Sequence, residues 1–163
     1  MMKIDNQEVP YIERTRDYYR ALGYQKDYVW AHCEEVPFTR LKNPLRELCI
    51  GLVTTAHPPD LSNKDSKGIR RVWSGATDPL PANLNTDKLA WDRESTHTED
   101  LGSYLPIRAV QAAVQAGLVS KLAARFHGVP TEYSQRKTIE IDAPNILNRL
   151  REDGADAALI CAL

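Results

Sequence analysis

Residues 153–163 read DGADAALICAL, and this stretch decides which class of fold the chain can form. A helix is expected to end at Gly154, and the apolar run over 156–162 has no polar alternation. Such a run is typical of a parallel strand that is buried on both faces in an α/β protein. Sites in open α/β sheets form beyond the carboxyl ends of the strands, so the run also predicts where a site would lie.

Two further segments predict strands that would pair with this one. Residues 48–56 read LCIGLVTTA, which is apolar and β-branched as a central parallel strand should be. Residues 118–124 have a weaker strand pattern, because Lys121 interrupts it. We expect residues 125–128, which read RFHG, to leave the sheet on the side where sites form.

Three helices are expected from apolar spacing and from their end signals. They cover residues 10–22, 106–116 and 143–153. Gly23 and Gly117 are suited to stop the first two, and Asp142 is suited to cap the third.

The order of these elements predicts an α/β fold. We expect a three-layer-like domain with a small, mainly parallel sheet, helices packed on it and one long polar loop over 61–103, in which residues 88–92 could form a short strand. Residues 1–163 are predicted to form one domain. Within it, residues 1–44 form a helix and an aromatic lead-in that packs Tyr28, Trp30 and Phe38 on the body, and residues 45–163 form the sheet-bearing body. Whether the body is truncated at its C-terminus is left open.

The bulk composition excludes several classes of function. The chain has 163 residues, with 21 Lys and Arg against 22 Asp and Glu. This balance removes the electrostatic argument for a nucleic-acid or anionic-membrane partner. Apolar runs are far shorter than the roughly 20 residues of a membrane helix. The start of the chain lacks the apolar core of a secretory signal, and three widely spaced cysteines predict neither disulfides nor a zinc site. We expect a cytoplasmic, reduced globular domain.

Three histidines are candidates for a site. His57 and His127 each follow a predicted strand and could line one pocket, although each could equally be a solvent-facing or capped loop residue. His97 lies in the loop segment 91–100, WDRESTHTED, which could fold over the sheet end and present it to a substrate. A metal site there is less favoured than a solvated loop, since no periodicity aligns these side chains. Cys161 is expected to be an inert buried thiol.

Several stretches look familiar when taken together. They are YIERTRDYY (11–19) with LGY (22–24), VPF (36–38) with PL (44–45) ahead of LVTTA (52–56), and RLREDGADA (149–157). In this order and spacing they resemble the selenoprotein B family of the glycine, sarcosine, betaine and D-proline reductases. The likeness covers most of the chain from about Val9 onward.

The resemblance implies reductive cleavage of a carbon–nitrogen bond in a small amino-acid or betaine substrate. A selenocysteine or cysteine redox pair is the implied reactive group, since such chemistry needs a nucleophile that is ionised at neutral pH. Reductase partner subunits or a thioredoxin-like reductant are the implied partners. The resemblance also implies substrate contacts for the loop through His97 and for residues 125–127. His57, His97, Arg125 and His127 are therefore the expected substrate-binding residues, with no metal ligand among them.

In the family, the redox pair follows the strand that matches residues 156–163. The role of nucleophile is therefore not assigned to Cys161, which lies within that strand. One hypothesis is that the reading frame was closed at a UGA codon for selenocysteine; a short non-catalytic paralogue and a deliberately shortened chain are the alternatives. An exposed apolar strand edge would favour self-association, so a homo-oligomer is expected. The rival function is a non-catalytic small-molecule-binding or subunit-interaction module, and a hydrolase or metal-dependent lyase is a third.

Overall fold

The computed structural model describes residues 10–27, 29, 31–32, 34–36, 39–90, 93–131 and 134–163. The chain divides into two compact units, Met1–Phe38 and Thr39–Leu163, which are described separately. The predicted packing of Tyr28, Trp30 and Phe38 lies outside the described residues.

The first unit contains one helix, α1 (Tyr11–Ala21), among its described residues. The chain leaves this helix through Gly23 at a φ of +90°, a backbone conformation that glycine adopts without steric cost. This confirms the predicted helix and its stop. None of the side chains of α1 is buried, and Tyr18 and Tyr19 meet edge to face with ring centroids 5.5 Å apart.

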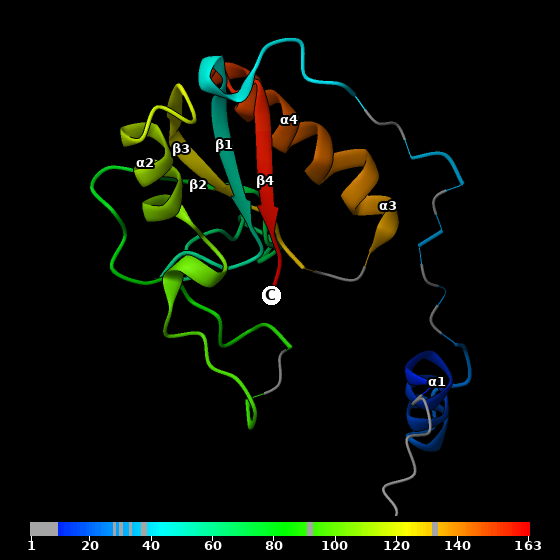
Figure 1. The fold of residues 1–163 in the computed structure, drawn as a ribbon. Helices are drawn as coiled ribbons and strands as arrows, with labels where there is room; N and C mark the ends of the chain where they lie inside the picture. Colours follow the sequence, from blue (N-terminus) through cyan, green and yellow to red (C-terminus); the bar gives the residue numbers. More distant parts are fainter. Residues whose placement is uncertain are drawn as a thin grey trace, which may run out of the picture. The chain divides into compact units, whose positions relative to one another are not determined.

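The second unit is built on a four-stranded sheet in the order β2-β3-β1-β4 (Figure 1). The strands are β1 (Cys49–Thr54), β2 (Trp73–Ala76), β3 (Lys121–Gly128) and β4 (Ala157–Cys161). Strand β1 is parallel to both of its neighbours, β3 and β4, whereas β2 is antiparallel to β3. The sheet is therefore small and mainly parallel, as the sequence predicts.

Helices cover both faces of this sheet, so the body has three layers (Figure 1). They are α2 (Ile107–Gln115), α3 (Gln135–Lys137) and α4 (Ala143–Glu152), with a π-helical turn η3 (Thr138–Asp142) between α3 and α4, and short 3-10 turns η1 (Leu45–Glu47) and η2 (Leu101–Ser103).

Two separate apolar clusters hold the layers together. On one face, Leu52 of β1 packs in a cluster with Ile107 of α2. On the other face, Val53 of β1 packs in a cluster with Ile146 of α4. Because neighbouring residues of a strand point to opposite faces, β1 supplies the centre of both clusters, and all six of its residues are buried.

The structure corrects the predicted end of β3. Arg125 and His127 do not leave the sheet; they belong to β3, which continues to Gly128. An irregularity interrupts the pairing, because Ile50 and Leu52 of β1 lie opposite Leu122 and Phe126 of β3. The Thr77 hydroxyl donates to the carbonyl oxygens of Ala123 and Ala124 at 2.8 and 3.0 Å, which stabilises this bulge from outside the strand.

The structure also corrects the long polar loop, which contains a strand. Strand β2 pairs with β3 over four residues, with Ser74 opposite His127. Residues 87–88 form a turn and residues 89–90 are irregular, so the described part of 88–92 is not the short strand that the pattern allowed, and residues 91–92 lie outside the described residues.

The last two elements also differ from the prediction. Strand β4 lies at the edge of the sheet and Ile160 is 72% exposed, so it is not a strand buried on both faces. The third helix does not begin at a cap on Asp142, whose backbone is helical and whose side chain caps nothing. The helical segment begins instead after Ser134, whose side chain accepts a hydrogen bond from the Lys137 backbone N–H.

Candidate functional site

The carboxyl ends of the three parallel strands meet at one edge of the body (Figure 1). Thr55 follows β1, and its hydroxyl accepts a hydrogen bond of 2.9 Å from the backbone N–H of Leu163, just after β4. Between the ends of β1 and β3, the Trp73 indole donates to the Ala56 carbonyl oxygen at 3.2 Å and lies against Gly128, where a Cβ atom would overlap the ring. The edge between β1 and β3 is thus closed by an indole.

The predicted site residue His57 lies in the connection that follows β1, and His97 lies in the connection that follows β2. His57 is fully buried, and its backbone pairs with that of Asn85 at 2.9 Å in both directions. His97 is exposed on the loop. The hydroxyls of Thr86 and Thr98 lie 2.7 Å apart, so the loop that carries His97 is tied to the segment that pairs with His57.

Arg125 and His127, the other two predicted residues, are brought together on the face of the sheet that α4 covers. Both contact Asp153, which ends α4. Arg125 donates from Nε to Asp153 Oδ1 at 2.7 Å and from Nη2 to Glu152 Oε2 at 3.2 Å. His127 Nε2 lies 3.0 Å from Asp153 Oδ2, a close polar contact between the ring and the carboxylate.

His127 lies in a buried polar network. Burial lowers its pKa, while the Asp153 carboxylate acts in the opposite direction and the Arg125 and Arg149 guanidinium groups add to the lowering. A neutral ring has one donor and one acceptor nitrogen, and the Nε2 side faces the carboxylate. We therefore assign the proton to Nε2, which leaves Nδ1 to accept from the Ser74 hydroxyl at 2.8 Å.

The Ser74 hydroxyl in turn contacts a second arginine. Arg149 of α4 donates from Nη1 to Ser74 Oγ at 2.6 Å and from Nε to Asn145 Oδ1 at 2.9 Å. A continuous relay thus runs from Asp153 through His127 and Ser74 to Arg149. It is built from the edge strand β2, from β3 and from α4.

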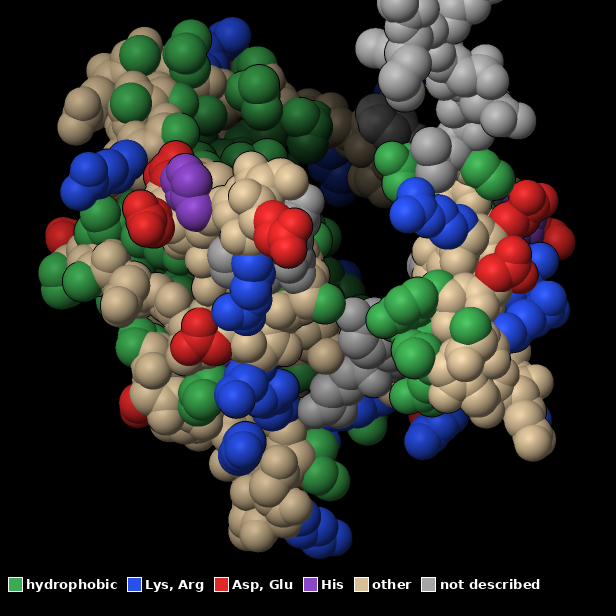
Figure 2. All heavy atoms as spheres, turned by 90° about the horizontal axis from the view of Figure 1, so that it is seen from below, with side chains coloured by type: hydrophobic (Ala, Val, Ile, Leu, Met, Phe, Trp, Pro, Cys, Tyr) green, Lys and Arg blue, Asp and Glu red, His purple; other side chains and the backbone are tan. Residues whose placement is uncertain are grey.

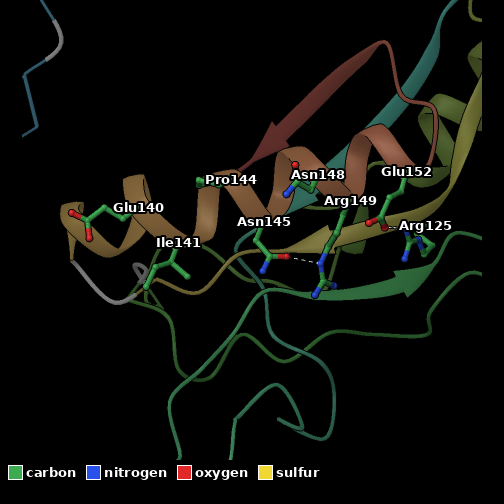
Figure 3. Close-up of a pocket in the computed structure, with 8 residues that line it drawn as sticks. All are labelled: Arg125, Glu140, Ile141, Pro144, Asn145, Asn148, Arg149 and Glu152. Carbon is green, nitrogen blue, oxygen red and sulfur yellow. Dashed lines mark hydrogen bonds and ion pairs between the residues drawn. The ribbon is translucent and has the colours of Figure 1, made fainter.

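Arg149 also lines an open groove of about 660 Å³ beside α4 (Figure 3). Its lining residues are Arg125, Glu140, Ile141, Pro144, Asn145, Asn148, Arg149 and Glu152. Most of them come from one side of the helical segment, as the spacing of three and four residues requires. Figure 3 shows Arg149 and Asn145 pointing toward each other from α4, with Arg125 at one end of the groove and Glu140 at the other.

The sequence reasoning missed the central members of this network, namely Ser74, Arg149 and Asp153. Ser74 stands in a stretch interpreted as loop, although the neighbouring Val72 and Trp73 have strand propensity and could have signalled a short strand. Arg149 and Asn145 are four residues apart and could have been recognised as neighbours on one helix face. The remaining contacts depend on tertiary structure.

The body, therefore, is a small α/β domain with helices on both sheet faces, a closed carboxyl edge and a polar groove beside α4. Comparison with known protein families, with curated proteins and with solved structures gave no match. Within the described residues, no cluster of three or more His, Cys, Asp and Glu side chains is arranged to hold a metal ion. No helix in the described part of the chain has the length and apolar character needed to span a membrane.

Proposed function

We propose that the body is the substrate-binding part of a reductase of the selenoprotein B type, which cleaves the carbon–nitrogen bond of a small amino acid or betaine reductively. The order of the family-like stretches along the chain supports this proposal. The single structural observation in its favour is the hydrogen bond from the Leu163 N–H to the Thr55 hydroxyl. The backbone after β4 shares an edge with the end of β1, where sites of α/β sheets form.

In this proposal the family's selenocysteine or cysteine redox pair follows β4 and supplies the nucleophile and the electrons for the cleavage. The residues described above bind the substrate or position other groups. His57 follows β1, His127 lies near the end of β3, and His97 is carried by a loop tied to the segment next to His57. Arg125 is held in place by Asp153 and Glu152, and in this proposal it is one of the residues that contact the substrate.

The proposed partners follow from the same chemistry. A redox pair that turns over must be reduced again, so the proposal includes reductase partner subunits or a thioredoxin-like reductant. It also includes a cytoplasmic location, because free thiols and selenols persist in reducing compartments.

Two measurements test this function together. The coding sequence beyond the Leu163 codon is read first, and the chain extended through that sequence is then assayed for amine release from glycine, sarcosine, betaine and D-proline with a dithiol as reductant. The proposal expects a UGA or cysteine codon shortly after Leu163 and reductant-dependent amine release from one of the four substrates. Ordinary in-frame stops, together with no amine release, would contradict it.

The second candidate is a small-molecule-binding or subunit-interaction module without redox chemistry. The groove beside α4 favours it, since six of its eight lining residues are polar or charged and none is a cysteine. The two candidates are separated by two measurements. Calorimetric titration tests whether the 163-residue chain binds glycine, sarcosine, betaine or D-proline, and the amine-release assay tests whether the extended chain cleaves them. Ligand binding without amine release by the extended chain would favour the module.

Self-association is a further part of the proposal. Among the strands that the structure describes, β4 has a neighbour on one side only, and Leu159 and Ile160 are exposed on it. An unpaired apolar strand edge can pair with a second chain. The face of the molecule seen in Figure 2 carries side chains of both charge signs.

A further inference from the structure

We propose that the groove beside α4 binds one small, singly charged carboxylate through the guanidinium group of Arg149. This site lies on a helix-covered face of the sheet and not at the carboxyl edge. It does not rest on the reductase proposal, because none of its contacts involves a redox residue.

The charges around the groove single out Arg149. Arg125 is neutralised by Asp153 at 2.7 Å and Glu152 at 3.2 Å. Glu140 is neutralised by Arg136 at 2.9 Å. Among the residues that the structure describes, the recorded partners of Arg149 are a hydroxyl and an amide oxygen, and no carboxylate pairs with it. A partly buried guanidinium group with neutral partners retains its attraction for an anion.

The donors of Arg149 suit a planar carboxylate. A guanidinium group carries five N–H donors, of which Nε–H is used by Asn145 and one Nη1–H by Ser74. The other donors of Nη1 and Nη2 remain for a ligand, and this edge of the group matches the two oxygens of a carboxylate. Asn148, one turn from Asn145 on α4, also lines the groove and offers a side-chain amide.

The hydrogen bonds of His127 and Ser74 fix the orientation of the Arg149 guanidinium group. His127 accepts from the Ser74 hydroxyl, so a lone pair of Ser74 Oγ is left to accept from Arg149 Nη1. His127 is fully buried and Ser74 is partly buried, so both are held by packing. Ser74 and His127 are thus positioning residues for Arg149.

The rim of the groove favours one negative charge over two. Glu140 and Glu152 line it together with Arg149 and Arg125, so the balance of these four charges is zero before a ligand binds. A monocarboxylate meets the guanidinium group of Arg149, which has no carboxylate partner among the described residues, whereas a phosphate dianion is repelled more strongly by the two glutamates. We therefore expect propionate to bind more tightly than inorganic phosphate at matched ionic strength.

The test is a titration of the ¹⁵N-labelled chain with sodium propionate, with sodium chloride at the same ionic strength as reference. The proposal expects saturable shifts of the Asn145 and Asn148 side-chain amide signals. Arg149→Gln should weaken propionate binding by about 10- to 100-fold, since hydrogen bonds to charged groups are worth about 1.5–3 kcal/mol. Arg149→Lys keeps the positive charge but loses the paired N–H donors of the guanidinium group, so it should weaken propionate binding by a smaller factor.

Arg151→Gln is the matched control. Arg151 lies on the same helix, is exposed and is not among the groove residues, so its loss should change affinity less than twofold. Ser74→Ala leaves the charge of Arg149 intact and should weaken binding by less than Arg149→Gln while retaining the preference over phosphate. Equal losses for Arg149→Gln and Arg151→Gln, or shifts that chloride reproduces, would overturn the site. Circular dichroism of each variant verifies that the fold is retained.

Discussion

Strands β1 and β4 have similar sequences and opposite environments. Both are short apolar runs, CIGLVT and AALIC, and both are expected from their sequences to be buried on two faces. In the structure all six residues of β1 are buried, whereas three of the five residues of β4 are exposed. The order of the strands explains the difference, because β1 lies between β3 and β4 while β4 has β1 alone as a neighbour. An apolar run thus predicts a strand, but its place in the sheet decides its burial.

The largest expected effect compares the same substitution in the two strands. Leu52→Ala in β1 removes a fully buried side chain and should lower the free energy of unfolding by about 2–5 kcal/mol. Leu159→Ala in β4, at a half-exposed position, should lower it by less than about 1 kcal/mol. Urea denaturation followed by circular dichroism measures both. Similar losses would show that β4 is covered in solution.

A second pair of variants adds atoms instead of removing them, at two positions that face each other in the β1–β4 register. A Cβ atom at Gly51 would lie against the Leu150 side chain of α4, so Gly51→Ala should destabilise the body by about 1–3 kcal/mol. Ala158 is exposed, and Ala158→Val should change the free energy of unfolding by no more than about 0.5 kcal/mol. Unchanged stability of Gly51→Ala would mean that α4 packs less closely on β1 than described.

A third prediction concerns pH and the buried strand next to β1. Burial lowers the pKa of His127 in the folded chain below its ordinary value of 6.5, and the nearby Arg125 and Arg149 act in the same direction against Asp153. Below about pH 6.5 the unfolded chain therefore binds the proton more readily, and the folded chain should lose up to about 1.4 kcal/mol of stability per pH unit. Above that pH this contribution is constant.

The matched variants for the pH prediction are His127→Gln and His97→Gln. The first should abolish this part of the pH dependence between about pH 6.5 and 5, where carboxylates contribute little. The second changes an exposed loop residue and should leave the dependence as in the parent chain. Denaturation curves across this pH range give the comparison, and an unaltered slope in His127→Gln would contradict it.

The smallest expected effect on stability is at the β4 edge itself. Ile160→Lys places a charge at a position that is 72% exposed, so the free energy of unfolding should change by no more than about 0.5 kcal/mol. Charged residues on edge strands oppose pairing with another chain, so the variant should lower self-association. Sedimentation velocity at increasing concentration measures this. A monomeric parent chain at high concentration would contradict the proposed oligomer.

The candidate site was predictable in part. The rule that sites follow parallel strands directed attention to His57 and His127. The prediction that the Arg125 to Gly128 segment leaves the sheet was wrong, because this segment forms the end of β3. The contact of Arg149 with Ser74 joins residues 75 positions apart. No local sequence pattern contains such a pair. The contact forms only because the short strand β2, which carries Ser74, pairs with β3 and so comes to lie near α4.

The amino-acid sequence by itself determined the class of fold and the place of its main elements. Apolar runs without alternation predict parallel strands with helices between them. Gly23 and Gly117 end helices because glycine adopts positive φ without strain. Tertiary structure alone decided the order of the strands, and with it the exposure of β4, the lowered pKa of His127 and the partners of Arg149. Sheet order depends on the packing of both faces at once, which is a property of the whole body and not of any one segment.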